Sequence, residues 1–117
     1  MKIYHFNQDT GKPISAFSSD FILSRIIQTD GKTHIGCVYL GPQGVIGYHQ
    51  AACPQLLLVM SGEGYVRGEE EEFTAVQAGQ AVFWAQDEWH ETRTDSGLTA
   101  IIIEGDSLNP ATYMTPV

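Results

Sequence analysis

The sequence predicts an all-β domain, a sandwich or barrel of antiparallel strands. Glycine-containing turn signals recur about every ten residues, and the segments between them are short runs of apolar or alternating residues. No stretch of eleven or more residues keeps a clean helical period, because glycines interrupt each candidate. The best turn signals are Asp30-Gly31, Ser61-Gly62, Ala78-Gly79 and Ser96-Gly97.

The strands follow from the runs between these turns. They are expected at residues 21–27, 34–40, 56–60, 63–67, 73–76, 80–84 and 98–104. Segments 56–60 and 99–103 are apolar at nearly every position, so both faces of each strand are expected to be buried. One face would point into the barrel, and the other would lie under another sheet, a terminal segment or a second subunit.

The remaining segments are expected to be irregular. Glu69 to Glu72 is a run of four acids after a glycine, and a solvated hairpin turn is favoured over a divalent cation site. The tail, 106–117, contains two prolines and little periodicity, and its apolar side chains are expected to lie across the body or across a dimer mate.

Composition excludes several classes of partner. The chain has 117 residues, enough for one domain, and its net charge of −8 comes from fourteen acids and six scattered bases. Nucleic acid and anionic membranes are therefore not expected as partners. Because no apolar run is long enough for a bilayer and the N-terminus does not resemble a secretion signal, we expect a cytoplasmic location. Cys37 and Cys53 are expected to be free thiols, Cys37 as a small buried hydrophobe.

Two segments contain the side chains that could bind a ligand or take part in catalysis. Residues 44–62 read GVIGYHQAACPQLLLVMSG, and residues 79–94 read GQAVFWAQDEWHETRT. In an extended strand, residues of one parity share a face, so His49, Cys53 and Gln55 point the same way unless Pro54 breaks the strand. His90 lies on a strand that a barrel can bring opposite them.

These segments resemble the two motifs of the cupin superfamily over about residues 33–105. The first motif of that family has two histidines one residue apart, a glutamate and a closing glycine; the second has a glycine, a proline and a third histidine. The matching positions are His49, Gln55 in place of the glutamate, Gly62, Gly79 and His90. The departures are Ala51 for the second histidine, Ala85 for the proline, Asp87 for the next glycine and Thr94 for the final asparagine.

The resemblance implies one cupin domain over 1–117, with N-terminal strands in 1–30, a core at 33–105 and an irregular tail. The fold would be an antiparallel jelly-roll barrel, or double-stranded β-helix. His49, Gln55 and His90 would bind one divalent transition metal (Mn, Fe, Ni, Cu or Zn). The pocket would be lined by Tyr48, Cys53, Leu57, Val59 and Trp84.

Several candidate ligands stay open at this point. Ala51 removes one imidazole and Gln55 carries no charge, so the metal would be held less tightly than by a full set. Cys53 is read as an inert thiol, with a thiolate ligand as the alternative. Glu88, Glu91 and Glu104 are read as solvated surface, although each could supply a carboxylate. His5 and His34 match nothing and receive no role.

Two functions are consistent with these residues. One is a metal-dependent enzyme acting on a small organic molecule, with oxygenase, isomerase and hydrolytic chemistry not distinguished. The other is a metal-free module that binds or senses a small molecule. A homodimer is expected in either case, because the apolar strand 56–60 needs cover on both faces.

Overall fold

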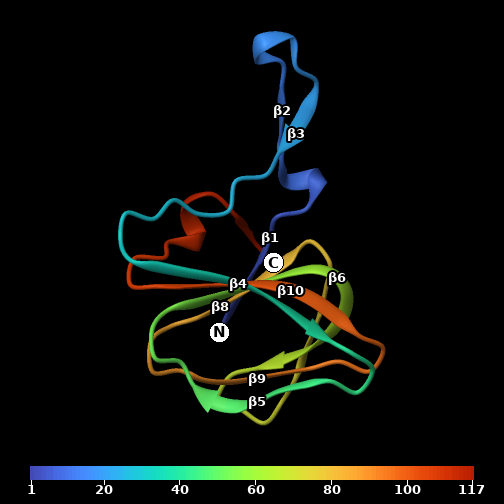
Figure 1. Ribbon diagram of the computed structural model, residues 1–117, viewed down its shortest axis with the longest axis vertical. Helices are drawn as coiled ribbons and strands as arrows, with labels where there is room; N and C mark the ends of the chain where they lie inside the picture. Colours follow the sequence, from blue (N-terminus) through green and yellow to red (C-terminus); the bar gives the residue numbers. More distant parts are fainter.

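The computed structural model describes all 117 residues, and they form eleven β-strands and three short 3-10 helices. Figure 1 shows a barrel from which one narrow hairpin projects. The strands are β1 (Lys2–His5), β2 (Lys12–Ile14), β3 (Phe21–Leu23), β4 (Thr33–Leu40), β5 (Val45–Gln50), β6 (Gln55–Arg67), β7 (Thr74–Gln77), β8 (Gln80–Trp84), β9 (Trp89–Arg93), β10 (Leu98–Gly105) and β11 (Thr115–Pro116). The 3-10 helices are η1 (Gln8–Thr10), η2 (Ala16–Ser18) and η3 (Pro110–Thr112). The all-β prediction is confirmed.

The barrel consists of two antiparallel layers that share one strand. The large sheet has the order β11-β1-β8-β6-β10-β4, and the small sheet runs β5-β9-β6-β7. Strand β6 pairs with β8 and β10 in its first half and with β7 and β9 in its second half. None of the helices is long and apolar enough to cross a bilayer.

Strand β6 corrects one expectation. The Ser61-Gly62 signal predicted a turn, but the chain continues as one strand of thirteen residues. Gly62 has φ 81°, and a Cβ there would collide with the carbonyl oxygen of Gly97. The strand therefore bends from one sheet into the other at a position that favours glycine, beside a register shift in its pairing with β10.

Both faces of residues 56–59 are buried, as predicted, but Met60, the last residue of the predicted segment, is 48% exposed. Leu57 and Val59 point into the barrel core, whereas Leu56 and Leu58 face outward and lie under Tyr4 and Met114. The outer cover therefore comes from β1 and the C-terminal tail of the same chain. This strand does not by itself require a second subunit.

Two edges of the fold differ from expectation. The predicted strand 21–27 is short, and β3 leaves the barrel to pair only with β2. Cys37, expected to be buried, is exposed, because it points outward from β4, the last strand of the large sheet.

The tail is irregular apart from η3 and β11, which pairs with β1. Cys37 and Cys53 are both free.

Candidate functional site

The two motif histidines face each other inside the barrel. His49 on β5 and His90 on β9 are direct cross-strand partners, which places their side chains on the same face of the small sheet. Their ring centroids are 4.3 Å apart, with the ring planes inclined at 57°. His90 is buried and His49 is open to solvent. The predicted convergence of these two residues is therefore present.

Contacts with backbone carbonyls determine which ring nitrogen of each imidazole carries the proton. Nδ1 of His49 lies 2.7 Å from the carbonyl oxygen of Gly47, and Nδ1 of His90 lies 3.3 Å from that of Glu88. Since a carbonyl oxygen only accepts hydrogen bonds, each Nδ1 carries the proton and donates it. Each Nε2 then holds a free lone pair. Nε2 of His90 is buried and has no hydrogen-bond partner in the protein.

Trp84 and Gln55 extend the site from the large sheet. The Trp84 ring stacks on His90 with centroids 4.5 Å apart and 24° between planes. Gln55 is the cross-strand partner of Trp84 and is 6% exposed. The Nε1 atom of Trp84 is a buried donor without a partner. One end of the barrel thus gathers an amide, an indole and two imidazoles.

The same row of the large sheet contains Glu104, which the sequence left as an alternative site carboxylate, and His34, to which it assigned no role. Glu104 of β10 pairs directly with Gln55 on one side and with His34 of β4 on the other. Paired residues share a face, so His34, Glu104, Gln55 and Trp84 form one row across the inner side. Alternation along the sequence places Leu98, Ala100, Ile102 and Glu104 on one face of the strand. It does not show whether that face points into the barrel.

The environment of His90 keeps its ring neutral. Burial lowers the pKa of His90, and the neighbouring His49 lowers it further. The hydrogen bond to the Glu88 carbonyl and the carboxylates of Glu88 and Glu104 raise it, but the net direction is downward from 6.5. Neutral imidazole is the form that binds a metal ion or accepts a hydrogen bond.

Tyr48 lies outside this cluster. It was predicted to line the pocket, but its ring stacks on Trp89 at 5.2 Å and lies under the guanidinium of Arg67 at 4.2 Å. Tyr48 directly precedes the inward-facing His49 on the same strand, so its side chain points away from the barrel interior.

Cys53 lies in the irregular segment between β5 and β6. Burial raises the pKa of Cys53, and the carboxylates of Glu104 and Asp106 raise it further, so the thiol stays protonated. This environment favours the inert reading of Cys53 over the thiolate ligand. Pro54 does separate the two strands, as the sequence suggested. Ala51, at the position of the absent histidine, is 2% exposed.

Two of the three candidate carboxylates are engaged elsewhere. Glu88 binds the N-terminal ammonium group and accepts a hydrogen bond from the backbone of Ala85. Glu91 lies between Arg67 and Arg93, with contacts of 2.9 and 2.8 Å. Burial raises the pKa of Glu91, but the two guanidinium groups outweigh it and hold the pKa below its usual value. Only Glu104 lies in the row beside Gln55.

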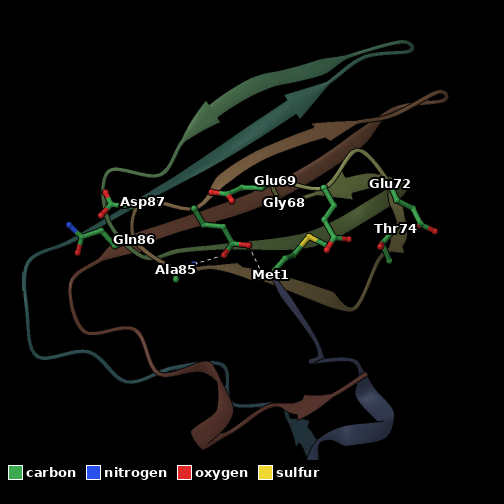
Figure 2. A pocket seen from close by; sticks show the side chains of 10 residues that line it. Met1, Gly68, Glu69, Glu72, Thr74, Ala85, Gln86 and Asp87 are labelled. Atoms are coloured by element: carbon green, nitrogen blue, oxygen red, sulfur yellow. Dashed lines mark hydrogen bonds and ion pairs between the residues drawn. The ribbon is translucent and has the colours of Figure 1, made fainter.

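The main cavities are formed by residues other than the histidine pair. One cavity, of about 640 Å³, lies beside the N-terminus. Its lining, drawn in Figure 2, includes Met1 and carboxylates from the 69–72 turn and from Asp87 and Glu88. None of the five main cavities is lined by His49, Gln55 or His90. The interior beside His90 is filled by Trp84, with Leu57 and Val59 deeper in the same core.

The residues present could hold a divalent ion, but they would leave several coordination positions open and supply little negative charge. No group of three His, Cys, Asp or Glu side chains forms a metal-binding cluster. The two imidazole rings are nevertheless direct neighbours, with centroids 4.3 Å apart, and the buried Nε2 of His90 lacks any other partner. Gln55 would add a neutral amide oxygen, so solvent or a bound molecule would fill the other positions.

The structure is similar to solved cupins. A cupin superfamily protein from Desulfitobacterium hafniense matches 73% of this chain and 77% of its own, with TM-score 0.61 and 10% identity. An RmlC-like cupin from Shewanella frigidimarina matches 68% of this chain and 70% of its own, with TM-score 0.60 and 15% identity. A predicted oxalate decarboxylase from Thermotoga maritima matches 62% and 65%, with TM-score 0.57 and 17% identity. No protein-family model and no curated protein sequence matches the chain.

Proposed function

Because this chain has a cupin fold, we propose that it binds one divalent transition-metal ion at the end of the barrel and uses this site on a small organic molecule. The observation that supports this most is the orientation of the two histidines. Both donate Nδ1–H to a backbone carbonyl, which leaves both Nε2 atoms free to bind. Such backbone contacts are typical of the outer shell that orients metal-binding histidines.

His49 and His90 would hold the ion, and the carbonyl oxygen of Gln55 would be the third protein ligand. Mn, Fe, Ni, Cu and Zn all accept imidazole nitrogen and amide oxygen. When bound, the ion would supply Lewis-acid or redox chemistry to a molecule in its open positions.

Glu104 gives the site the charge that Gln55 lacks. Its strand places it directly beside Gln55, and its carboxylate is close enough to raise the pKa of His90. A carboxylate there would favour a cation in the site, and it could accept a proton from a bound molecule at a carboxylate oxygen. Trp84 would form the dry wall of the site behind His90.

A metal-free ligand site is the second candidate, and the interior hydrogen-bonding groups favour it. Nε1 of Trp84 is a buried donor without a partner, and Nε2 of His90, whose ring stacks on Trp84, is also buried without a partner. A small molecule with both an acceptor and a donor would satisfy them. The oxalate decarboxylase neighbour does not choose between the candidates, since 17% identity shows the fold alone.

Calorimetric titration of the metal-stripped protein with Zn²⁺ and Mn²⁺ tests the proposal. We expect one ion per chain, with binding lost in the His49→Ala/His90→Ala variant. Gln55→Glu adds a charged ligand and should tighten binding by about tenfold or more. Cys53→Ser is the matched control and should bind as the parent does.

The titration also separates the two candidates. No heat of binding in the parent protein with either ion would reject the metal site and leave the metal-free reading. Binding that survives the double substitution would place the ion elsewhere and reject His49 and His90 as ligands.

A further inference from the structure

A cavity of about 460 Å³ lies at the base of the hairpin of residues 12–23, here called the arm. Figure 1 shows the arm projecting from the barrel, with the C-terminal tail near its base. One wall of the cavity comes from the arm, and another comes from Thr112 and Tyr113 of the tail. The volume is within the range of sites that bind small molecules.

One face of the arm forms its wall of this cavity. Lys12 and Leu23 are direct cross-strand partners of β2 and β3, so their side chains share a face. Ile14 lies two residues after Lys12 on β2 and belongs to the same face. Arg25 follows β3 and also lines the cavity. This side of the cavity therefore combines two cationic side chains with two aliphatic ones.

The cavity at the arm differs in charge from the other four main cavities. Each of those is lined by at least one aspartate or glutamate and by no lysine or arginine. The cavity at the arm is lined by Lys12 and Arg25 and by no acidic residue. The whole chain has fourteen acids and only six bases. Two bases beside one cavity without a carboxylate therefore create a local positive potential in an acidic protein.

The protein does not neutralise either of these bases. Arg67 and Arg93 form ion pairs with Glu91, whereas Lys12 and Arg25 form none. The guanidinium of Arg25 lies over the ring of Tyr113, 5.4 Å from the ring centroid. A cation–π contact of this kind orients the guanidinium but leaves its N–H groups free to donate hydrogen bonds. An oriented guanidinium and a nearby ammonium group therefore lack a counter-ion.

We propose that this cavity is a second ligand site, which binds a small organic anion with an apolar skeleton. The carboxylate or phosphate group of such a molecule would accept hydrogen bonds from the guanidinium of Arg25 and the ammonium of Lys12. Its carbon skeleton would lie against the two aliphatic side chains and the Tyr113 ring. The site shares no residue with the histidine pair and is independent of the proposed metal.

A bound anion would also connect the arm to the tail. Lys12 and Leu23 belong to the arm and Tyr113 belongs to the tail, so one ligand would contact both. No residue of 12–23 is buried, and an isolated two-stranded hairpin is marginally stable in water. We therefore expect the ligand to slow backbone hydrogen exchange in the arm and to raise the melting temperature of the protein.

NMR titration of the ¹⁵N-labelled, metal-stripped protein tests the site. Phenylacetate and phenyl phosphate each join an apolar ring to an anionic group, and the tighter of the two identifies the preferred head group. We expect saturable shifts of the backbone amides of Ile14, Leu23 and Tyr113 with at least one of these anions. Benzyl alcohol lacks the charge and inorganic phosphate lacks the ring, so both should bind more weakly.

Substitutions test the role of the two charges. Lys12→Gln and Arg25→Gln should each weaken anion binding by about fivefold or more, because each removes a charge-assisted hydrogen bond. Lys32→Gln removes the same charge at a position outside the cavity, and this variant should bind as the parent does. Circular dichroism establishes that each variant is folded.

Several results would overturn the proposal. One is the absence of saturable shifts with both anions up to tens of millimolar. Others are equally tight binding of benzyl alcohol or of inorganic phosphate, and an Arg25→Gln variant that binds as tightly as the parent. The His49→Ala/His90→Ala variant should bind the anion as the parent does, and loss of binding in that variant would reject a separate site.

Discussion

The two ends of the barrel interior are built from different chemistry. At one end Val59, Val66 and Leu98 pack in a continuous apolar core, and the Thr94 hydroxyl nearby donates to the carbonyl oxygen of Glu63 at 2.7 Å. Toward the other end the interior holds His90 and Trp84, which stack on each other and each have a buried polar atom without a partner, whereas the first end has one such atom beside Val66, Oγ1 of Thr92. The same strands, β6, β9 and β10, supply both ends.

This difference separates residues that stabilise the fold from residues that lower its stability. Apolar burial contributes favourably at the first end. A buried polar atom without a partner costs about 1–3 kcal/mol, so the second end is less stable than an apolar filling of the same volume. The ion or small molecule proposed above would satisfy these groups.

The largest expected effect on the stability of the fold comes from a substitution at the apolar end. Leu98→Ala removes a side chain that is 3% exposed within the interior core and leaves a cavity. We expect the free energy of unfolding to fall by about 3 kcal/mol. Denaturant titration measures it. A loss under about 1 kcal/mol would show that this end is not tightly packed.

A smaller effect is expected from pH at the polar end. The pKa of His90 is lowered in the folded protein, chiefly by burial, so the unfolded chain binds the proton more readily. Stability should therefore fall as the pH decreases below about 6.5, and the decline should level off once the pH is below the lowered pKa of the folded state. Thermal unfolding between pH 8 and 5 measures this. His90→Gln should reduce the decline, and an equal decline in that variant would assign it to other groups.

The smallest effect is expected from Trp84→Phe. The substitution removes the unpartnered Nε1–H and keeps an aromatic ring against His90. The smaller ring loses some packing, but a buried donor without a partner is removed, so the free energy of unfolding should change by less than about 1 kcal/mol. A loss above about 3 kcal/mol would contradict this account and indicate that Nε1 donates a stabilising hydrogen bond.

Alternation and motif spacing predicted much of the site. The barrel, the buried strand 56–59 and the meeting of His49 with His90 all follow from residues of one parity on strands that a barrel closes together. Glu104 was read as solvated surface, with a site carboxylate only as the alternative, and His34 received no role, because their side chains gain a common face only through pairing between distant strands. That pairing depends on register, which one sequence does not reveal.

Other misses have local causes. Tyr48 points outward because it directly precedes the inward-facing His49 on the same strand, and a bend at Gly62 replaced the expected turn. Cys37 looked buried because its neighbours are apolar, but β4 proved to be an edge strand. Bulges and edges are properties of the assembled sheet, so an apolar run alone does not distinguish them.

Long-range ¹H–¹⁵N NMR of the imidazole rings tests the histidine pair most directly. The contacts of both Nδ1 atoms with backbone carbonyls predict that His49 and His90 carry the proton on Nδ1, and the proposed metal site predicts that Zn²⁺ shifts the Nε2 resonances of both rings together. A proton on Nε2 of His90, or a Zn²⁺ response confined to one ring, would contradict a shared site between them.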